Sequence, residues 1–298
     1  MSGTFDAEWL ALREPADHAA RDRGAAVLLP ALDSALDRAL PAGRASTVLD
    51  LGCGTGSDVR WLAPRLSRPQ HWVLVDHDAA LLRRAVEALE ERPAAVLSVT
   101  ARAVGLADLA EADLAGVDLI ATSALLDLLT PADLDHLVGV CVAARTPLLA
   151  ALSVTGEVHL EPSEPLDQQL AAAFDAHQRR PTGESERLGP DAPTSAALAF
   201  DRVGWRVTTA ETAWALGAGD AQLTTAWLDG WVRAAVEQEP GLAEQVDDYV
   251  DRRARQIAAG QLVVGVGHRD LLAVPPVGPD RPAVAYGTLS GREQAAGG

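Results

Sequence analysis

Cysteine is scarce in this sequence, which excludes two common ways of stabilising a small domain. Only two cysteines, Cys53 and Cys141, occur among 298 residues. Cys53 lies in a glycine-rich turn and Cys141 in an apolar helical run, and neither has a partner at the spacing of a metal site. We therefore expect no disulfide and no metal centre.

Aromatic residues and long apolar runs are also rare. Phe, Trp and Tyr make up 4% of the chain, against 48% for all hydrophobic residues, so Leu, Val and Ala have to fill most of the core. No uncharged apolar run reaches the roughly 18 residues of a membrane-spanning helix. The stretch from Met1 to Leu12 contains acids and lacks the apolar core of a signal peptide. These features predict a soluble, cytoplasmic protein without a membrane partner.

Positive charge is the third shortage. Lysine is absent, so all 25 basic residues are arginine, and 42 acidic residues give a net charge of -17. Such a chain repels phosphate backbones and anionic membranes. Residues 251–255 come closest to a basic cluster, but acids surround them, as on a solvated helix face. We expect no nucleic acid partner. The length fits one large α/β domain or two small ones, present as a monomer or homodimer.

Short apolar runs and amphipathic stretches alternate along the first half of the chain. This alternation, with short connections, predicts a parallel sheet with helices on both faces. The expected strands are 46–52, 71–76, 95–103, 117–122 and 147–154, with helices at 57–66, 79–91 and 131–144. Before them we expect an irregular arm over residues 1–15 and a helix over 16–40 that Pro30 kinks or divides.

The alternation ends after residue 154. Residues 156–160 either extend the fifth strand or pair with it. Further helices are expected at 165–180, 195–203, 221–237 and 242–259, with strands at 206–211 and 261–274. We predict a loop over 181–193 and a disordered tail over 275–298, which is rich in Pro, Gly and Ala.

A glycine-rich turn, Asp50-Leu-Gly52-Cys-Gly54-Thr-Gly56, joins the first strand to the next helix. Glycine permits a tight turn and a close approach of ligand to backbone. A dinucleotide fingerprint would need glycine at position 57, which is serine. Asp50 would repel a pyrophosphate, whereas it suits a ligand that carries an ammonium group. The turn therefore favours a cationic nucleotide over a dinucleotide.

This D-x-G-x-G-x-G pattern resembles motif I of the class I methyltransferases that depend on S-adenosyl-L-methionine (SAM). The alternatives are a nicotinamide or flavin nucleotide site and a turn without a ligand. The resemblance implies SAM as cofactor and S-adenosyl-L-homocysteine (SAH) as product. It also implies a seven-stranded, mostly parallel sheet with helices on both faces, in which the last strand is antiparallel and lies between the fifth and sixth.

The resemblance divides the chain into three segments. Residues 1–45 form an N-terminal arm and helix that cover the cofactor site. Residues 46–274 form the methyltransferase domain, with an insertion after strand five, 156–200, as the acceptor lid. The tail over 275–298 completes the chain.

The resemblance also assigns cofactor contacts. Those of the turn are Asp50, Gly52, Gly54 and Gly56. Asp76 closes the second strand and is the acid that accepts both ribose hydroxyls; Asp78 either competes for that role or caps the next helix. Asp108 would meet the adenine amino group, and Thr122 and Ser123 the methionine moiety.

The acceptor side is less defined by the sequence. Asp127 would orient an acceptor or act as a base, or is a turn residue. His177 lies with Phe174 and Gln178 on a short helical segment, and His159 is a further candidate base. Arg13 and Arg21 lie at helical spacing and either meet the SAM carboxylate or an anionic acceptor, or form an exposed salt-bridge ladder.

The resulting hypothesis is methyl transfer from SAM to O, N or C of a small-molecule metabolite, with Asp127 and His177 as catalytic residues. A SAM-fold enzyme with other chemistry is one alternative. A catalytically silent SAM-binding or scaffold subunit is the other.

Overall fold

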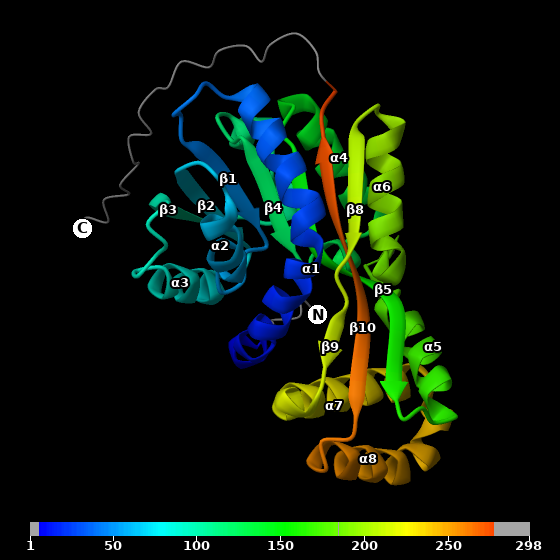
Figure 1. Cartoon of the computed structure of the whole chain (residues 1–298). Coiled ribbons are helices and arrows are strands. Elements are labelled where there is room, and N and C mark those ends of the chain that lie inside the picture. The colour runs from blue at the N-terminus through cyan, green and yellow to red at the C-terminus, as the bar shows by residue number, and fades with distance from the viewer. Residues whose placement is uncertain (1–5, 184, 277–298) are drawn as a thin grey trace, which may run out of the picture.

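The computed structural model describes residues 6–183 and 185–276. These residues build a mixed sheet with the strand order β3-β2-β1-β4-β5-β10-β8, and β9 pairs with β10 (Figure 1). The strands are β1 Ser46–Leu51, β2 Gln70–Asp76, β3 Val96–Ala103, β4 Leu119–Ser123, β5 Leu148–Glu161, β8 Arg206–Glu211, β9 Trp214–Leu216 and β10 Val263–Val274. β10 runs antiparallel to both β5 and β8, whereas β1 to β5 are parallel. The predicted position of the last strand, antiparallel and between the fifth and sixth, is confirmed, and β9 is an addition to the predicted strands.

Helices cover both faces of the sheet (Figure 1). Neighbouring residues of a strand point to opposite faces, so Val48 of β1 packs with α1, α2 and α3, and Leu49 packs with α4 and α6. These helices are α1 Ala7–Ala39, α2 Ser57–Leu62, α3 Ala79–Ala88, α4 Pro131–Ala144 and α6 Ala192–Arg202. Burial on both sides explains why the strand sequences are continuous apolar runs.

Helix α1 begins earlier than the sequence predicted. It runs from Ala7 to Ala39 with Pro15 and Pro30 inside it, so the irregular arm over residues 6–15 and a division at Pro30 are both wrong. A proline removes one backbone hydrogen bond from a helix, and tertiary contacts compensate here. Ion pairs tie α1 to α2 and the residues after it, at Glu14–Arg60, Arg21–Asp58, Asp22–Arg65 and Asp37–Arg68.

β5 and β10 continue past the end of β4 and carry a second group of helices, which we name the lower lobe. It comprises the outer halves of β5 and β10, β9, α5 Leu166–Gln178, α7 Ala221–Gln238 and α8 Ala243–Ala258 (Figure 1). Residues 156–160 extend β5 and pair with β10, as one of the two expectations had it. Leu170, Trp227, Trp231 and Tyr249 lie in the apolar core of this lobe.

Short elements complete the described chain. The hairpin β6 Pro181–Thr182 and β7 Ser185–Glu186 lies in the expected loop. The 3-10 turns are η1 Ala63–Arg65, η2 Leu106–Asp108, η3 Glu111–Leu114, η4 Leu126–Leu128, η5 Gly189–Asp191, η6 Ala218–Asp220 and η7 Pro240–Leu242. The tail expected over 275–298 falls outside the described residues from position 277 onward.

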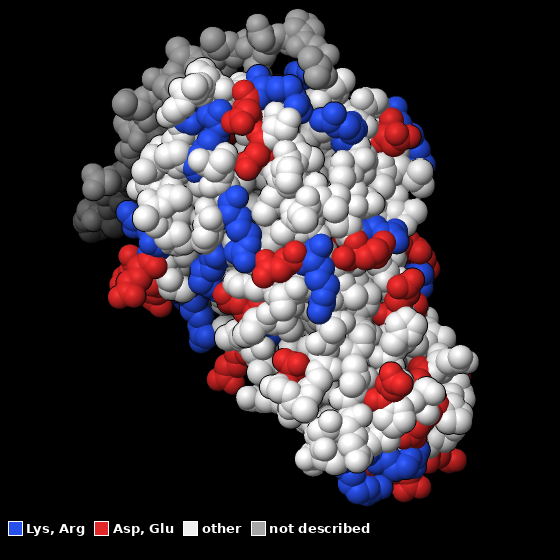
Figure 2. Space-filling view, viewed as in Figure 1, with Lys and Arg blue, Asp and Glu red and all other residues white. Residues whose placement is uncertain are grey.

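Charged side chains of both signs are interspersed over the face shown in Figure 2. Among residues 6–183 and 185–276, no helix combines the length and apolar character needed to span a bilayer.

Candidate functional site

The glycine turn adopts a backbone conformation that side chains would strain. Gly52, Gly54 and Gly56 have φ angles of 69°, 52° and 80°, in the left-handed region that favours glycine. The N–H groups of Gly52 and Cys53 both donate to the Val75 carbonyl oxygen, at 2.8 and 3.1 Å. The turn is thereby fixed to the end of β2, and its glycines leave bare backbone for a ligand to approach.

The side chain of Asp76 provides a second link between the turn and the end of β2. It is 6% exposed, and its Oδ2 accepts the Gly54 N–H at 2.9 Å while its Oδ1 accepts the Asp78 N–H at 2.9 Å. Asp78 caps α3, since its Oδ1 accepts the N–H groups of Ala80 and Leu81 at 2.7 and 3.2 Å. The capping alternative for Asp78 is confirmed.

A pocket lies where the turn meets the ends of β2 and β4. Open α/β sheets bind ligands at such carboxyl ends of parallel strands. The pocket is lined by Leu10, Arg13, Gly52, Gly54, Asp76, His77, Asp78, Leu81, Ser123, Ala124, Leu125 and Leu128. It therefore brings together five predicted cofactor residues, namely Arg13, Gly52, Gly54, Asp76 and Ser123. Leu10 and Arg13 place the N-terminal end of α1 along its wall.

Four other predicted cofactor residues do not line this pocket. Gly56 precedes α2 as its N-cap residue. The Thr122 hydroxyl donates to the Leu51 carbonyl oxygen at 2.8 Å and so joins β4 to β1. Asp108 is exposed in η2, and Asp50 is buried behind the turn. Their cofactor roles stay predictions without support from the pocket.

Asp50 belongs to a buried cluster of charged groups behind the turn. It is 1% exposed, and neither carboxylate oxygen has a hydrogen-bond partner. Arg21 of α1 pairs with Asp58 of α2 at 2.7 Å, with both side chains 2% exposed. Arg21 is thus part of a buried pair and not of an exposed salt-bridge ladder. Burial, then the charge of Asp58, raises the pKa of Asp50 well above its usual range, which favours a neutral acid at this position.

Asparagine at position 50 is expected to change the pH dependence of stability. Because the pKa of Asp50 is raised in the folded chain, the folded state keeps a proton that the unfolded state releases above about pH 3.8. The stability from this proton is present below that pH and is lost as the pH rises through the folded pKa. Relative to the wild type, the free energy of unfolding of Asp50→Asn should therefore rise by at least about 1 kcal/mol from pH 4 to pH 7. Urea unfolding of both proteins across that pH range tests this prediction. A difference in the free energy of unfolding that stays the same at every pH would contradict it.

Of the two predicted catalytic residues, Asp127 lies beside the pocket and His177 does not. Asp127 is in η4, between the lining residues Leu125 and Leu128. Its Oδ1 is buried without a hydrogen-bond partner, and burial raises its pKa against the opposing charge of Arg13. The Nε2 of His177, at the end of α5, lies 3.3 Å from a carboxylate oxygen of Glu237. His159, the other candidate base, is exposed on β5.

Sequence reasoning gave no individual role to Ala124, Trp214 or His268, which lie at or behind the pocket. Ala124 lines it with a φ of 52°, a strained conformation of the kind found at functional sites. Trp214 of β9 and His268 of β10 lie behind Arg13, with ring centroids 5.4 Å apart. Only the fold brings these two rings to α1, because they come 201 and 255 residues after Arg13 in the chain.

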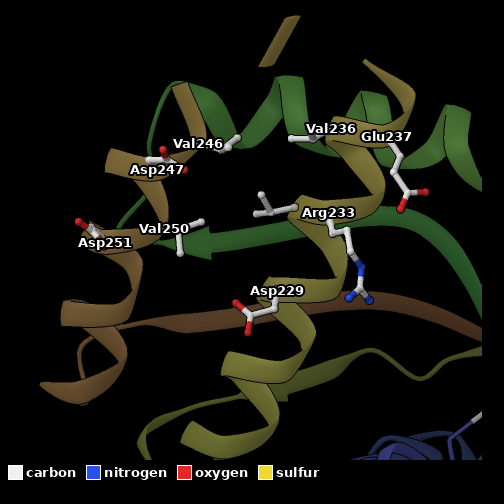
Figure 3. A pocket seen from close by; sticks show the side chains of 9 residues that line it. Asp229, Arg233, Val236, Glu237, Val246, Asp247, Val250 and Asp251 are labelled. Atoms are coloured by element: carbon white, nitrogen blue, oxygen red, sulfur yellow. The ribbon is translucent and has the colours of Figure 1, made fainter. Parts of the chain in front are cut away.

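A second hollow lies in the lower lobe between α7 and α8. Figure 3 shows valines of the two helices pointing toward one another, with carboxylates along the rim. It is lined by Asp229, Val232, Arg233, Val236, Glu237, Val246, Asp247, Val250 and Asp251. None of these residues lies at the carboxyl end of a parallel strand, where open α/β sheets bind their ligands. Across the described ranges, no three His, Cys, Asp or Glu residues are grouped to hold a metal ion, and both cysteines are free and buried.

Comparisons with known proteins bear on this site. Residues 48–147 match the family model described as "Methyltransferase domain", whereas no curated protein matches the sequence. Among solved structures, the chain is similar to a cyclopropane synthase from Mycobacterium tuberculosis, with 16% identity, a TM-score of 0.47, and coverage of 91% of this chain and 94% of that one. It is also similar to a geranyl diphosphate C-methyltransferase from Streptomyces coelicolor, with 12% identity, a TM-score of 0.44, and coverage of 83% and 76%. Values this low carry no detail of the site.

The matched segment contains the elements that build the pocket. It starts within β1, includes the glycine turn, Asp76 and the end of β4, and stops just before β5. The sheet has the strand order and the antiparallel strand that motif I implied. The segment that builds the pocket therefore matches a methyltransferase domain, which is an enzyme domain.

Proposed function

We propose that the chain transfers the methyl group of SAM to an O, N or C atom of a small-molecule metabolite in the cytoplasm. The observation that carries this proposal is the position of the pocket. The glycine turn, Asp76 and the N-terminal end of α1 all line it. It lies beside the end of β4, past which β5 continues into the lower lobe. The net charge of -17 disfavours a nucleic acid as the acceptor and so favours a small molecule.

The lining residues fit the chemical groups of SAM. The oxygens of Asp76 each accept one backbone N–H, and a carboxylate oxygen has a second lone pair for a ribose hydroxyl. The bare backbone of Gly52 and Gly54 lets a ligand lie against the turn. Asp76 and Asp78 give this wall the negative charge that suits a sulfonium cation, and Arg13 offers a positive group for its carboxylate.

Bound SAM supplies an electrophilic methyl group on a sulfonium sulfur. The chain then has to align an acceptor with it and exclude water. Leu10, Leu125 and Leu128 give the pocket an apolar wall for this purpose. Asp127 lies in η4 between the lining residues Leu125 and Leu128. It would take the proton of a hydroxyl or amine acceptor as the S–CH3 bond breaks, SAH leaves and the new bond forms. We assign this step to Asp127 and not to His177, because His177 does not line the pocket and its Nε2 lies 3.3 Å from a carboxylate oxygen of Glu237.

Titration calorimetry with SAM and with SAH tests whether the pocket binds the cofactor. We expect saturable binding of both, with Kd values of about 1–100 μM. A panel of small alcohols, phenols and amines, with SAH release as the readout, then tests the transfer. Absence of heat from both ligands with folded protein would overturn the proposal. SAH binding without release for any acceptor would favour the silent SAM-binding subunit.

A further inference from the structure

The guanidinium of Arg13 is held by a carboxylate on its own helix. Arg13 Nε lies 2.8 Å from Asp17 Oδ2, and Arg13 Nη2 lies 3.1 Å from Asp17 Oδ1. Both side chains are largely buried, at 13% and 11% exposed. Paired N–H···O bonds of this kind fix the plane as well as the position of a guanidinium. Nη1 takes no part in this pair and is left for another ligand.

A tryptophan of the lower lobe completes the arrangement. The Trp214 Nε1–H donates to Asp17 Oδ1 at 2.9 Å, and the Trp214 ring centroid lies 5.1 Å from Arg13 Cζ. Trp9, one turn before Arg13 on α1, lies 6.0 Å from the same atom. Aromatic faces at this distance attract a guanidinium. Arg13 is thus held at its edge by Asp17 and flanked by two indoles.

His268 supports this arrangement from β10 without opposing the charge of Arg13. Its ring centroid lies 5.4 Å from that of Trp214, and it is 2% exposed. Burial, then the nearby charge of Arg13, lowers the pKa of His268 to about 3. The imidazole is therefore uncharged at neutral pH and does not repel the guanidinium.

The charges of the pocket indicate which ligand group meets Arg13. Among the lining residues, Arg13 is the one guanidinium, and the other ionisable side chains are Asp76, His77 and Asp78, at the end of β2 and before α3. SAM and SAH each carry one anionic group, the carboxylate of the amino-acid half. Opposite charges pair most strongly where water is displaced, so this carboxylate is the complementary partner of Arg13.

We propose that Asp17 and Trp214 are positioning residues that hold the guanidinium of Arg13 in place to bind the carboxylate of SAM. A strand of the lower lobe, 197 residues from Asp17, thereby sets the selectivity of the pocket for the amino-acid half of the cofactor. The inference rests on the proposed function, because it takes SAM as the ligand.

The test compares SAH with 5′-methylthioadenosine, which keeps the adenosine and sulfur but lacks the amino-acid half. Arg13→Met, which retains the apolar stem, should weaken SAH binding by about 10–100-fold and change methylthioadenosine binding by less than about 2-fold. Asp17→Asn and Trp214→Phe should each weaken SAH binding by about 5–10-fold, again with methylthioadenosine unaffected. Asp17→Glu should recover some of the loss. The ratio of the two Kd values is the readout, because general damage to the fold would raise both.

The chain offers a matched control on the same helix. Asp22 accepts the Trp61 Nε1–H at 2.9 Å and an Arg65 N–H at 2.8 Å, and Arg65 lies 4.7 Å from the Trp61 ring centroid. This second Asp–Trp–Arg set does not line the pocket, so Asp22→Asn should leave the ratio unchanged.

Three outcomes overturn the inference, and each has a different meaning. If wild-type protein binds both ligands and the Asp17 and Trp214 variants keep the wild-type ratio, the positioning role is wrong and the proposed function stands. If folded wild-type protein binds neither SAM nor SAH, the proposed function fails and the inference fails with it. A loss restricted to acceptor turnover would assign Arg13 to the acceptor and also overturn the inference.

Discussion

Replacing Arg21 with methionine is expected to lower the free energy of unfolding by about 3–5 kcal/mol. Arg21 pairs with Asp58 at 2.7 Å, and its guanidinium lies 3.8 Å from the Trp61 ring centroid. Its charge also lowers the raised pKa values of Asp50 and Asp270. Without it, the carboxylate of Asp58 would remain in an apolar interior with no cation beside it. Urea unfolding at neutral pH measures the loss.

Arg60→Met is the matched control for Arg21→Met. Arg60 also joins α2 to α1, through two bonds of 2.6 Å to Glu14, but these side chains are 26% and 19% exposed. Solvent screens such a pair, so its loss should cost about 1 kcal/mol or less. Adding Asp58→Asn to Arg21→Met should recover much of the stability, since no unpaired charge then stays buried. Equal costs for the Arg21 and Arg60 variants would contradict the prediction.

The elements that the sequence predicted best are those that depend on burial or on the conformation of a few neighbouring residues. β1 and β4 are buried on both faces, so their sequences are short apolar runs with no competing pattern. The turn at Gly52, Gly54 and Gly56 was recognisable because its φ angles demand glycine. Asp76 followed from its place at the end of the next strand. Each of these features depends on a few neighbouring residues, which a sequence displays directly.

The remaining errors involve contacts between distant segments of the chain. Residues 7–15 look irregular in sequence because they are polar and include Pro15, yet Asp6 caps α1 and Glu14 pairs with Arg60. The catalytic role of His177 stays a prediction, and its contact with Glu237 was not visible in the sequence because Glu237 comes 60 residues later. The support of Arg13 by Trp214 requires a lobe built from segments far apart in the chain. No local pattern encodes such contacts.

Alanine at position 76 is expected to weaken SAH binding by at least about 100-fold, or roughly 2.7 kcal/mol. The change removes the acceptor proposed for the ribose hydroxyls together with the acceptors for the Gly54 and Asp78 N–H groups. The turn then keeps only its backbone bonds to Val75 as a link to β2. Asp76→Asn keeps one oxygen and should cost about 10-fold. Calorimetry should show the same losses for 5′-methylthioadenosine, because that ligand retains the ribose. The loss of 5′-methylthioadenosine binding would distinguish the Asp76 variants from Arg13→Met, which should leave the binding of that ligand almost unchanged.

Asp78→Asn distinguishes the two acids that follow β2. Asp78 also lines the pocket, but its Oδ1 is used by the N–H groups of Ala80 and Leu81. Asparagine caps a helix about as well as aspartate, so the variant should keep both its stability and an affinity for SAH within about 3-fold of the wild type. If it instead loses more affinity than Asp76→Asn, the ribose acid is Asp78. Asp76 would then serve only to hold Gly54, and the recognition of the sugar would depend on the first turn of α3 and not on the end of β2.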